Sequence, residues 1–270
     1  MNMAHCHPCP LQAEAITVSY DRQQVLHRLS IKIPRGETTV IIGPNGCGKS
    51  TLLKALARLL TPEHGTILLN GNAIAHQRTR EIARTLGMLP QSSQAPDNIR
   101  VRDLVAQGRY PHRGRLARWR ERDEQALQEA MHATGLTALA ERRVDTLSGG
   151  QRQRVWLAMV LAQQTATLLL DEPTTWLDVA HQIDLLERMT RLRDSHGKTL
   201  VMVLHDLNQA CRYATHLVAM KEGEIVAQGR PADVVTPAMI DQVFGLKCIV
   251  MDDPVAHTPM IVPLGGFAGP

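Results

Sequence analysis

Residues 38–51 read TTVIIGPNGCGKST, an apolar run that leads into a glycine-rich loop. The loop matches GxxxxGK[ST] and is followed by the helical stretch LLKALARLL, which is the context of a phosphate-binding loop. Glycines let backbone N–H groups converge on phosphate oxygens, and the positive end of the following helix dipole points to the same place. Lys49 supplies a charge between the outer phosphates, and Ser50 presents a hydroxyl to Mg²⁺. The predicted phosphate site comprises Gly43, Pro44, Asn45, Gly46, Cys47, Gly48, Lys49, Ser50 and Thr51.

Two more apolar runs of strand length end in polar residues, at 166–172 (ATLLLDE) and at 199–206 (TLVMVLHD). Ligands of open α/β sheets bind outside the carboxyl ends of the strands, so these polar ends are expected to meet the phosphate loop. We predict that Asp171 holds Mg²⁺ and that Glu172 polarises an attacking water. A lone histidine at a strand end is more often structural, but its convergence with the other strand ends favours contact of His205 with the γ-phosphate or that water.

The order of apolar runs indicates an α/β fold with a buried parallel sheet, because strand-length runs alternate with amphipathic helical stretches. Two glycine-bounded segments, 65–71 and 223–229, have the pattern of antiparallel strands. Helical periods replace strand-like runs between 91 and 165, which indicates a helical insertion. After 231 we expect short helices and then a proline-rich tail. The predicted units are a flexible tail at 1–10, a nucleotide-binding core with a small antiparallel β subdomain at 11–90 and 166–235, a helical subdomain at 91–165, and a C-terminal extension at 236–270.

Composition and charge indicate which broad class of protein this chain belongs to, among globular, membrane-spanning, secreted and nucleic-acid-binding proteins. The chain has 270 residues, 44% hydrophobic and 21% charged, which is ordinary for a soluble globular protein. No apolar run reaches the roughly 18 residues that span a bilayer, and the first ten residues do not resemble a signal peptide, so we expect a cytosolic chain. A net charge of +4 is too weak to predict nucleic-acid binding by itself. The stretch 109–122 holds six arginines and is either a solvated surface or a face that meets an anionic leaflet or a partner.

The five cysteines do not predict a disulfide framework, because their number is odd and three of them are widely separated. Cys6 and Cys9 form a CxxC pair flanked by His5 and His7. A structural zinc site usually needs a second ligand pair at a regular spacing, and none follows. We therefore favour a disordered N-terminal tail over a zinc site.

Tyr20 and Gln91 carry no signal as single residues, and their predicted roles depend on the motifs around them. Tyr20 ends a strand-like segment and could stack on an adenine, although packing is the commoner role for such a tyrosine. Gln91 begins the helical insertion, where its amide could reach Mg²⁺ or the attacking water and report on it.

Taken together, these motifs resemble the nucleotide-binding subunit of ABC transporters, over essentially the whole chain and in the order of that family. The phosphate loop is similar to Walker A, LLLDEP to Walker B, Gln91 to the Q-loop, and His205 to the switch histidine. The stretch LSGGQRQR resembles the ABC signature, which is close to diagnostic among phosphate-loop proteins, and TTWLD resembles the D-loop. Tyr20 matches the adenine-stacking position of the family, which reverses the preference for a packing role. The resemblance implies a RecA-like P-loop NTPase core with an antiparallel β subdomain and the helical subdomain specific to ABC proteins.

The resemblance also implies a mechanism that involves two copies of the chain. ATP and Mg²⁺ lie between the Walker A loop of one copy and the signature of the other, so that Ser148, Gly149, Gly150 and Gln151 act in trans. Asp178 of the D-loop crosses the same interface, and Ser50, Gln91 and Asp171 form the metal set. Cys47 stands where many family members have serine or alanine, and we expect its alkylation to block ATP turnover unless ATP protects it.

Finer features resemble the ATPases of ferric-siderophore importers, namely DEPTTWLDVAHQIDLLE, LHDLNQACRYATHLVAM and the C-terminal tail. Such a subunit works with transmembrane permease subunits and, through them, a substrate-binding protein, at the cytoplasmic face of the membrane. Docking of the permease is expected near 92–120, which borders the arginine-rich stretch. The alternatives are the ATPase of a haem or cobalamin importer, or a soluble ABC ATPase of iron–sulfur assembly or DNA repair. The siderophore-type tail and the lack of long insertions disfavour the soluble classes.

Overall fold

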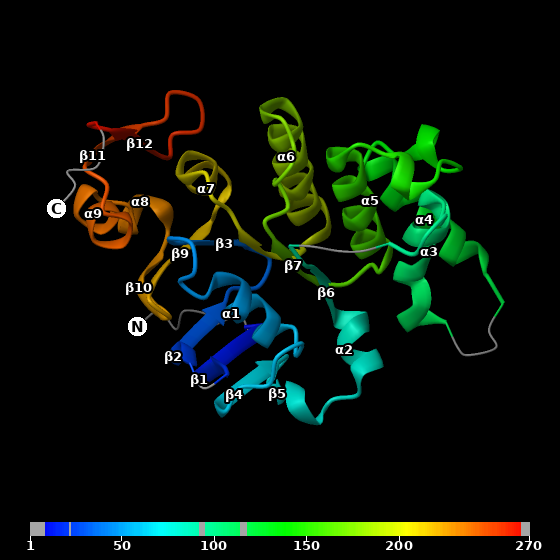
Figure 1. The fold of residues 1–270 in the computed structure, drawn as a ribbon, viewed down its shortest axis with the longest axis horizontal. Helices are drawn as coiled ribbons and strands as arrows, with labels where there is room; N and C mark the ends of the chain where they lie inside the picture. The colour runs from blue at the N-terminus through cyan, green and yellow to red at the C-terminus, as the bar shows by residue number, and fades with distance from the viewer. Residues whose placement is uncertain (1–8, 22, 92–94, 114–117, 266–270) are drawn as a thin grey trace, which may run out of the picture.

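The computed structural model describes residues 9–21, 23–91, 95–113 and 118–265, and its centre is a six-stranded sheet in the order β10-β9-β3-β8-β7-β6 (Figure 1). Every strand pair is parallel except β10 with β9 at one edge. All residues of β3, β7 and β8 are buried, as expected of a sheet covered on both faces. The strands are β3 (Thr38–Ile42), β6 (Leu86–Leu89), β7 (Thr167–Asp171), β8 (Thr199–Val203), β9 (His216–Lys221) and β10 (Glu224–Gly229). The predicted α/β class with a parallel sheet is confirmed.

A second, antiparallel sheet packs over one face of the central sheet, with α1 (Lys49–Leu56) between the two in a shared apolar cluster. Its order is β2-β1-β4-β5. The strands are β1 (Leu11–Tyr20), β2 (Gln23–Ile33), β4 (His64–Leu69) and β5 (Asn72–Ala73). The antiparallel prediction for 65–71 is confirmed by β4. The segment 223–229 is also antiparallel, but as β10 it extends the central sheet because it forms a hairpin with β9.

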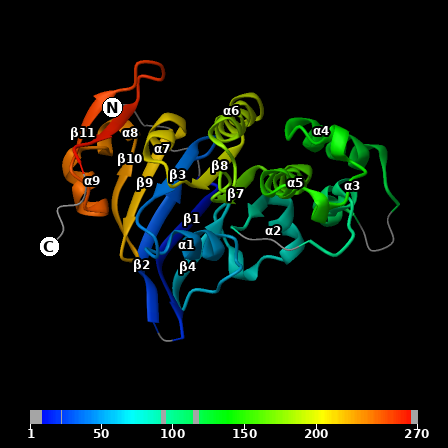
Figure 2. The same cartoon turned by 45° about the horizontal axis from the view of Figure 1, so that its top comes forward.

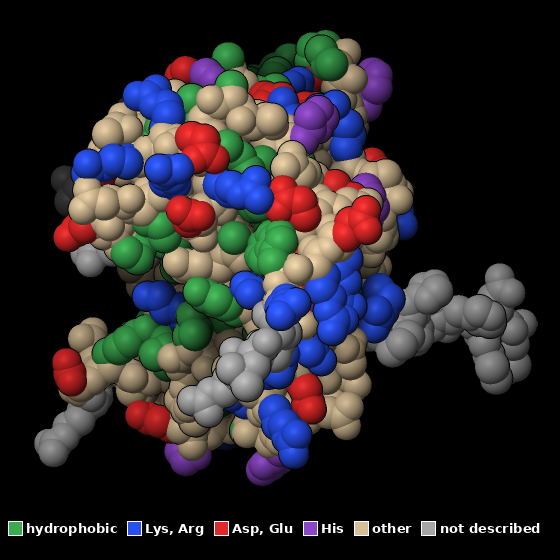
Figure 3. Space-filling model, turned by 90° about the vertical axis from the view of Figure 1, so that its right-hand side faces the viewer, with side chains coloured by type: hydrophobic (Ala, Val, Ile, Leu, Met, Phe, Trp, Pro, Cys, Tyr) green, Lys and Arg blue, Asp and Glu red, His purple; other side chains and the backbone are tan. Residues whose placement is uncertain are grey.

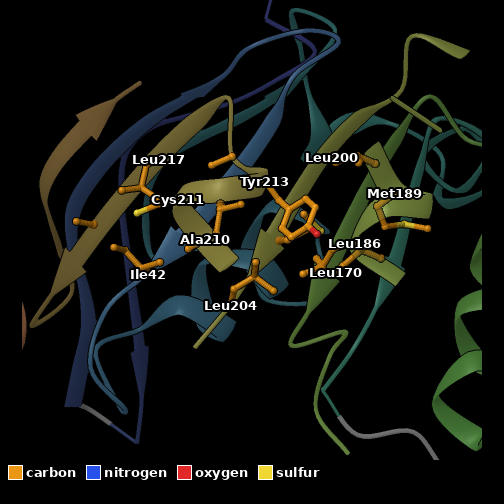
Figure 4. Packing of buried hydrophobic residues seen from close by; sticks show 14 of the residues in the cluster. Ile42, Leu170, Leu186, Met189, Leu200, Leu204, Ala210, Cys211, Tyr213 and Leu217 are labelled. Atoms are coloured by element: carbon orange, nitrogen blue, oxygen red, sulfur yellow. The ribbon is translucent and has the colours of Figure 1, made fainter. Parts of the chain in front are cut away.

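The opposite face of the central sheet is covered by α6 (Val179–His196) and α7 (Leu207–Tyr213), followed by α8 (Pro231–Val234) and α9 (Pro237–Phe244). Figure 4 shows side chains of α7, among them Tyr213, beside Leu170 and Leu200 of the sheet and Leu186 and Met189 of α6. This apolar layer holds α6 and α7 against that face of the sheet.

Helices α3 (Val101–Ala106), α4 (Glu121–Ala133) and α5 (Gly149–Ala162) form a separate apolar cluster at one end of the molecule, green in Figures 1 and 2. Helix α2 (Thr79–Thr85) leads from the antiparallel sheet into β6. The short 3₁₀ turns are η1 (Ile74–His76), η2 (Gln107–His112), η3 (Thr137–Leu139) and η4 (Val144–Thr146). The helical content agrees with the pattern of 91–165, while the predicted boundaries between the units stay predictions.

The C-terminal segment is not the tail that its prolines suggested. It forms a hairpin of β11 (Cys248–Asp252) and β12 (Pro259–Pro263), red in Figure 2, at the end opposite to α3–α5. Both prolines stand at the ends of β12, opposite Asp252 and Cys248. The missing N–H of proline is tolerated there, because a two-stranded hairpin has only edge strands. The predicted N-terminal tail and CxxC pair lie almost wholly outside the described residues.

Candidate active site

The loop between β3 and α1 has a shape that only glycine permits at its two ends. Gly43 has φ 154°, and a Cβ atom there would lie 2.3 Å from the carbonyl oxygen of Met220. Gly48 has φ 102° and starts α1. Lys49 is 6% exposed, and its Nζ donates to the carbonyls of Gly43 and Pro44, each at 2.8 Å. These bonds hold the ammonium group against the loop.

Ser50 and Asp171 join the loop to the end of β7. Ser50 Oγ donates to Asp171 Oδ1 at 2.9 Å. Asp171 is fully buried, and its Oδ2 has no hydrogen-bond partner among the described residues. Burial raises the pKa of Asp171, and the hydrogen bond from Ser50 opposes that rise. A buried carboxylate oxygen without a donor is costly unless a cation or donor meets it.

Glu172 is held by three side chains, two of them from distant parts of the chain. His205 Nε2 lies 2.7 Å from Glu172 Oε1, Thr175 Oγ1 donates to Oε2 at 3.2 Å, and the Gln91 amide also hydrogen-bonds the carboxylate. Burial alone raises the pKa of Glu172, but the bonds from His205, Gln91 and Thr175 outweigh it and hold the pKa below its usual value. Glu172 is therefore an ionised carboxylate at neutral pH with a fixed direction.

These groups surround a cavity of about 400 Å³ that opens to the surface. The lining residues are Val25, Asn45, Gly46, Gly48, Lys49, Ser50, Thr51, Gln91, Glu172 and His205. The structure thus brings together the predicted phosphate loop, the catalytic candidates and Gln91. Of the residues predicted to bind ATP or Mg²⁺ within one chain, the following do not line this cavity: Tyr20, Gly43, Pro44, Cys47 and Asp171.

Tyr20 and Cys47 are the two residues whose positions differ most from those predicted from the sequence. Tyr20 is 42% exposed at the end of β1, and Val25, which the sequence did not single out, lines the cavity instead. Cys47 is 4% exposed in the apolar cluster under the loop, and burial raises the pKa of its thiol. The effect of Cys47 alkylation on turnover stays a prediction, but a buried thiol with a raised pKa reacts slowly.

The signature residues lie away from this cavity, at the start of α5. Ser148 is the N-cap, with its Oγ accepting from Gln151 N at 3.3 Å and its own N–H donating to Gln151 Oε1 at 3.1 Å. Gly149 and Gly150 lie beside the D-loop of the same chain, and a Cβ on Gly150 would come 2.9 Å from Leu177 Cδ2. The signature residues therefore form an exposed capping box at the start of α5, and they do not line the cavity beside the phosphate loop.

The D-loop ends at Asp178, which caps α6. Asp178 Oδ1 accepts from the backbone N–H of His181 at 3.0 Å and from its Nδ1 at 2.7 Å, and these bonds lower the pKa of Asp178. Gln182, one turn into α6, donates to the carbonyls of Thr174 and Leu177. No sequence motif singled out Thr175 or Gln182. The position of Thr175, three residues after Glu172, was the one signal that could have indicated its contact with the carboxylate.

Comparisons with known proteins agree with this geometry. The family model described as "ABC transporter" matches residues 26–175. The ferric enterobactin transport ATP-binding protein FepC of Escherichia coli K12 is 57% identical over 258 residues, which cover 96% of this chain and 95% of FepC. The achromobactin transport ATP-binding protein CbrD of Dickeya dadantii is 51% identical and covers 94% of this chain and 95% of its own length.

Solved structures give the same result. A chain of a metal-chelate type ABC transporter in an inward-facing conformation matches with a TM-score of 0.81 at 29% identity, covering 95% of this chain and 97% of that one. A bacterial ABC transporter cassette solved as a dimer matches with a TM-score of 0.74 at 26% identity, covering 82% and 98%. In the described part of the chain, no helix is long and apolar enough to cross a membrane. The chain therefore belongs to the ABC transporter family, as an ATP-binding subunit with ATPase activity.

Proposed function

We propose that this chain hydrolyses ATP to drive the uptake of a ferric siderophore, as a peripheral subunit on the cytoplasmic face of the membrane. The arrangement around Glu172 is the main support for hydrolysis by these residues. An ionised carboxylate, oriented by His205 and Thr175, faces the cavity that Lys49 and the phosphate loop line. In that position Glu172 accepts hydrogen bonds from a water and directs its attack on the γ-phosphate.

The residues at this edge fit a magnesium ion that arrives with ATP. Mg²⁺ prefers oxygen ligands, and the Ser50 hydroxyl and the Asp171 carboxylate provide them at adjacent positions. Asp171 Oδ2, which has no hydrogen-bond partner in the described part of the chain, supports this assignment, because a cation compensates the buried oxygen. Gln91, which bonds Glu172 here, is the third proposed member of the metal set. When bound, Mg²⁺ neutralises charge on the outer phosphates.

A complete site needs a second copy of the chain. Ser148, Gly149, Gly150 and Gln151 are at the N-terminus of α5, where backbone N–H groups and the helix dipole favour an anion, yet they do not line the cavity of their own chain. We assign them to the γ-phosphate held by the other copy, with Asp178 crossing the same interface. An exchange of this kind is isologous and closes as a two-fold dimer.

Transmembrane permease subunits are the proposed partners, with a substrate-binding protein delivering the substrate to them. Figure 3 shows Lys and Arg side chains gathered on the face that carries α2 and α3. Arg80 and Arg84 both donate to the carbonyl of Pro111 in η2, which draws two positive charges together. This concentration of charge favours an acidic partner segment. The predicted docking region at 92–120 includes residues 92–94 and 114–117, which lie outside the described part.

The substrate is proposed from the relatives. Besides FepC and CbrD, a petrobactin import ATP-binding protein of Bacillus anthracis is 50% identical. A haem importer is the second candidate, because the hemin import ATP-binding protein HmuV of Gloeobacter violaceus is 42% identical over 94% of both chains. A cobalamin importer and a soluble ABC ATPase of iron–sulfur assembly or DNA repair are the remaining alternatives.

Deletion of the gene tests the substrate assignment. We expect loss of growth when one ferric siderophore is the sole iron source, and unchanged growth on haem or on ferrous iron. A plasmid copy of the parent should restore growth, and a Glu172→Gln copy should not. Loss of growth on haem alone would transfer the assignment to haem, and normal growth on every iron source would contradict iron uptake altogether.

A further inference from the structure

The C-terminal hairpin is bound to the helix that begins beside His205. His205 is followed by Asp206, the N-cap of α7. One turn later the side chain of Asn208 pairs with the backbone of Ile261 in β12: Nδ2 donates to the Ile261 carbonyl at 3.2 Å, and the Ile261 N–H donates to Oδ1 at 2.7 Å. The Asn208 side chain therefore makes the same pair of backbone hydrogen bonds with Ile261 that a neighbouring strand would make. These bonds fix the position of β12 relative to α7.

A second bond between the same two elements is an ion pair. Arg212, one turn beyond Asn208, donates to both carboxylate oxygens of Asp253, from Nε at 3.0 Å and from Nη2 at 2.8 and 3.0 Å. Asp253 also accepts the backbone N–H groups of Val255 and Ala256, so it shapes the turn between β11 and β12 as well. Asp253 is 7% exposed, and these backbone bonds together with Arg212 lower its pKa.

The hairpin is itself anchored, so it can serve as a support for α7. Cys248 of β11 and Ile261 of β12 are buried in the same apolar cluster as Met239 and Ile240 of α9. On its other side α7 contacts α6, because Gln209 donates to Gln182 Oε1 at 2.8 Å, and Gln182 in turn donates to the D-loop carbonyls of Thr174 and Leu177. The helix spans only Leu207–Tyr213, and a helix this short depends on its neighbours for its position.

We propose that Arg212, Asn208 and Asp253 are positioning residues for hydrolysis, through which the C-terminal hairpin holds α7 and thereby keeps His205 against Glu172. The separation of His205 and Glu172 is 2.7 Å, so a shift of α7 by an ångström removes the hydrogen bond. This inference rests on the proposed function of Glu172 and His205. None of the three positioning residues lines the ATP cavity, so the inference predicts an effect on turnover and not on nucleotide affinity.

The chain offers a matched control in the neighbouring carboxylate. Asp252, on the same hairpin, pairs with exposed His257 at 3.1 Å. In the full-length chain with ATP and Mg²⁺, we expect Asp253→Asn to lower kcat roughly tenfold or more while KM for ATP stays within about twofold. Asp252→Asn should match the parent in both constants. Asn208→Ala removes the other contact and should lower kcat in the same way. It replaces Asp253→Asn as the test if circular dichroism shows that Asp253→Asn is poorly folded.

Combination with His205→Ala separates positioning from a general loss of structure. Under single-turnover conditions, Asp253→Asn should cause no further loss in the His205→Ala chain, because the residue that it positions is gone. A full and independent loss in that background overturns the inference, and so does a kcat for Asp253→Asn equal to that of Asp252→Asn. If the parent chain itself hydrolyses no faster than Glu172→Gln, the proposed function fails first, so the two failures are distinguishable.

Discussion

At the scale of single residues, Glu172 combines backbone strain with the geometry expected of the proposed catalytic carboxylate. Its φ is 52°, a left-handed conformation that costs a non-glycine residue on the order of 1–3 kcal/mol. The strain persists because buried β7 ends at Asp171 and the hydrogen bonds from His205 and Thr175 hold the carboxylate on the other side of the turn. The two consecutive carboxylates therefore point in different directions: Asp171 lies beside Ser50, and Glu172 faces the cavity.

Replacement of Glu172 by glutamine tests this assignment. Glutamine has nearly the same shape but a much weaker affinity for a water proton, so we expect ATP turnover to fall on the order of a hundredfold or more while ATP binding persists. Turnover is measured by phosphate release and binding by fluorescence of a nucleotide analogue. Glu63→Gln, at an exposed loop position, is the control and should keep parental turnover. Normal hydrolysis by Glu172→Gln would remove Glu172 from its proposed role.

At the scale of elements, the helical cluster α3–α5 has its own polar support. Arg109 of η2 and Asp123 of α4 are 3% and 1% exposed, and Arg109 Nε donates to Asp123 Oδ1 at 3.1 Å. Arg109 Nη1 also donates to the Ala162 carbonyl at the end of α5 at 2.8 Å. The buried pair thus joins three elements of the cluster, and its loss leaves an unpaired buried charge.

We expect Arg109→Met to lower the free energy of unfolding by about 3–5 kcal/mol, because the Asp123 carboxylate then stays buried without its cation. Chemical denaturation measures this loss. Arg100→Met removes a comparable but exposed pair with Glu141 and should cost at most about 1 kcal/mol. Equal effects of the two substitutions would contradict the assigned role of the buried pair.

The same pair predicts a dependence on pH. Burial alone raises the pKa of Asp123, but the bonds from the Arg109 side chain and the Arg120 backbone outweigh it and leave the pKa below its usual value. A folded-state pKa below the unfolded one means stability that is present above the unfolded pKa, about 3.9, and is lost as the pH falls through the folded pKa. The difference between parent and Arg109→Met should therefore shrink below pH ~4 in the same denaturation experiment.

At the scale of the whole molecule, the two predicted phosphate-binding segments lie on different units. The loop at 43–51 joins the end of β3 in the central sheet to α1, whereas Ser148 and its neighbours begin α5 of the helical cluster. Within one chain the signature contacts Trp176 and Leu177 and not the ATP cavity. The exposed side chain of Trp176, 79% accessible, lies beside the same signature glycines.

Mixed dimers test whether the signature acts in trans. A Ser148→Arg chain retains its own phosphate loop, and a Lys49→Ala chain retains its own signature, so one of the two sites in the mixed pair is free of both changes. We expect co-purified, differently tagged mixed dimers to keep roughly half of the parental turnover. Each homodimer should be inactive. Loss of all activity in the mixed dimer would mean that the phosphate loop and the signature of the same chain form one site, which contradicts action in trans.

Much of the fold and of the candidate site followed from short-range patterns. Glycine spacing predicted a phosphate loop, and polar residues after buried strands predicted that Asp171, Glu172 and His205 lie near it, because strand ends of a parallel sheet meet at one edge. The hairpin at 248–263 was missed, since its prolines discourage strands unless the strand lies at an edge, and only the fold determines which strand is at an edge.

The sequence by itself determined the chemistry of this protein: a phosphate loop, a carboxylate pair, a histidine and a signature, in the order of a known family. Only the tertiary structure decided which groups touch. Val25 on the cavity and Arg212 with Asp253 both depend on the packing of segments that are separate along the chain. Local patterns encode backbone conformation and residue type, whereas such contacts depend on how sheet, helices and hairpin pack together, which no single segment specifies.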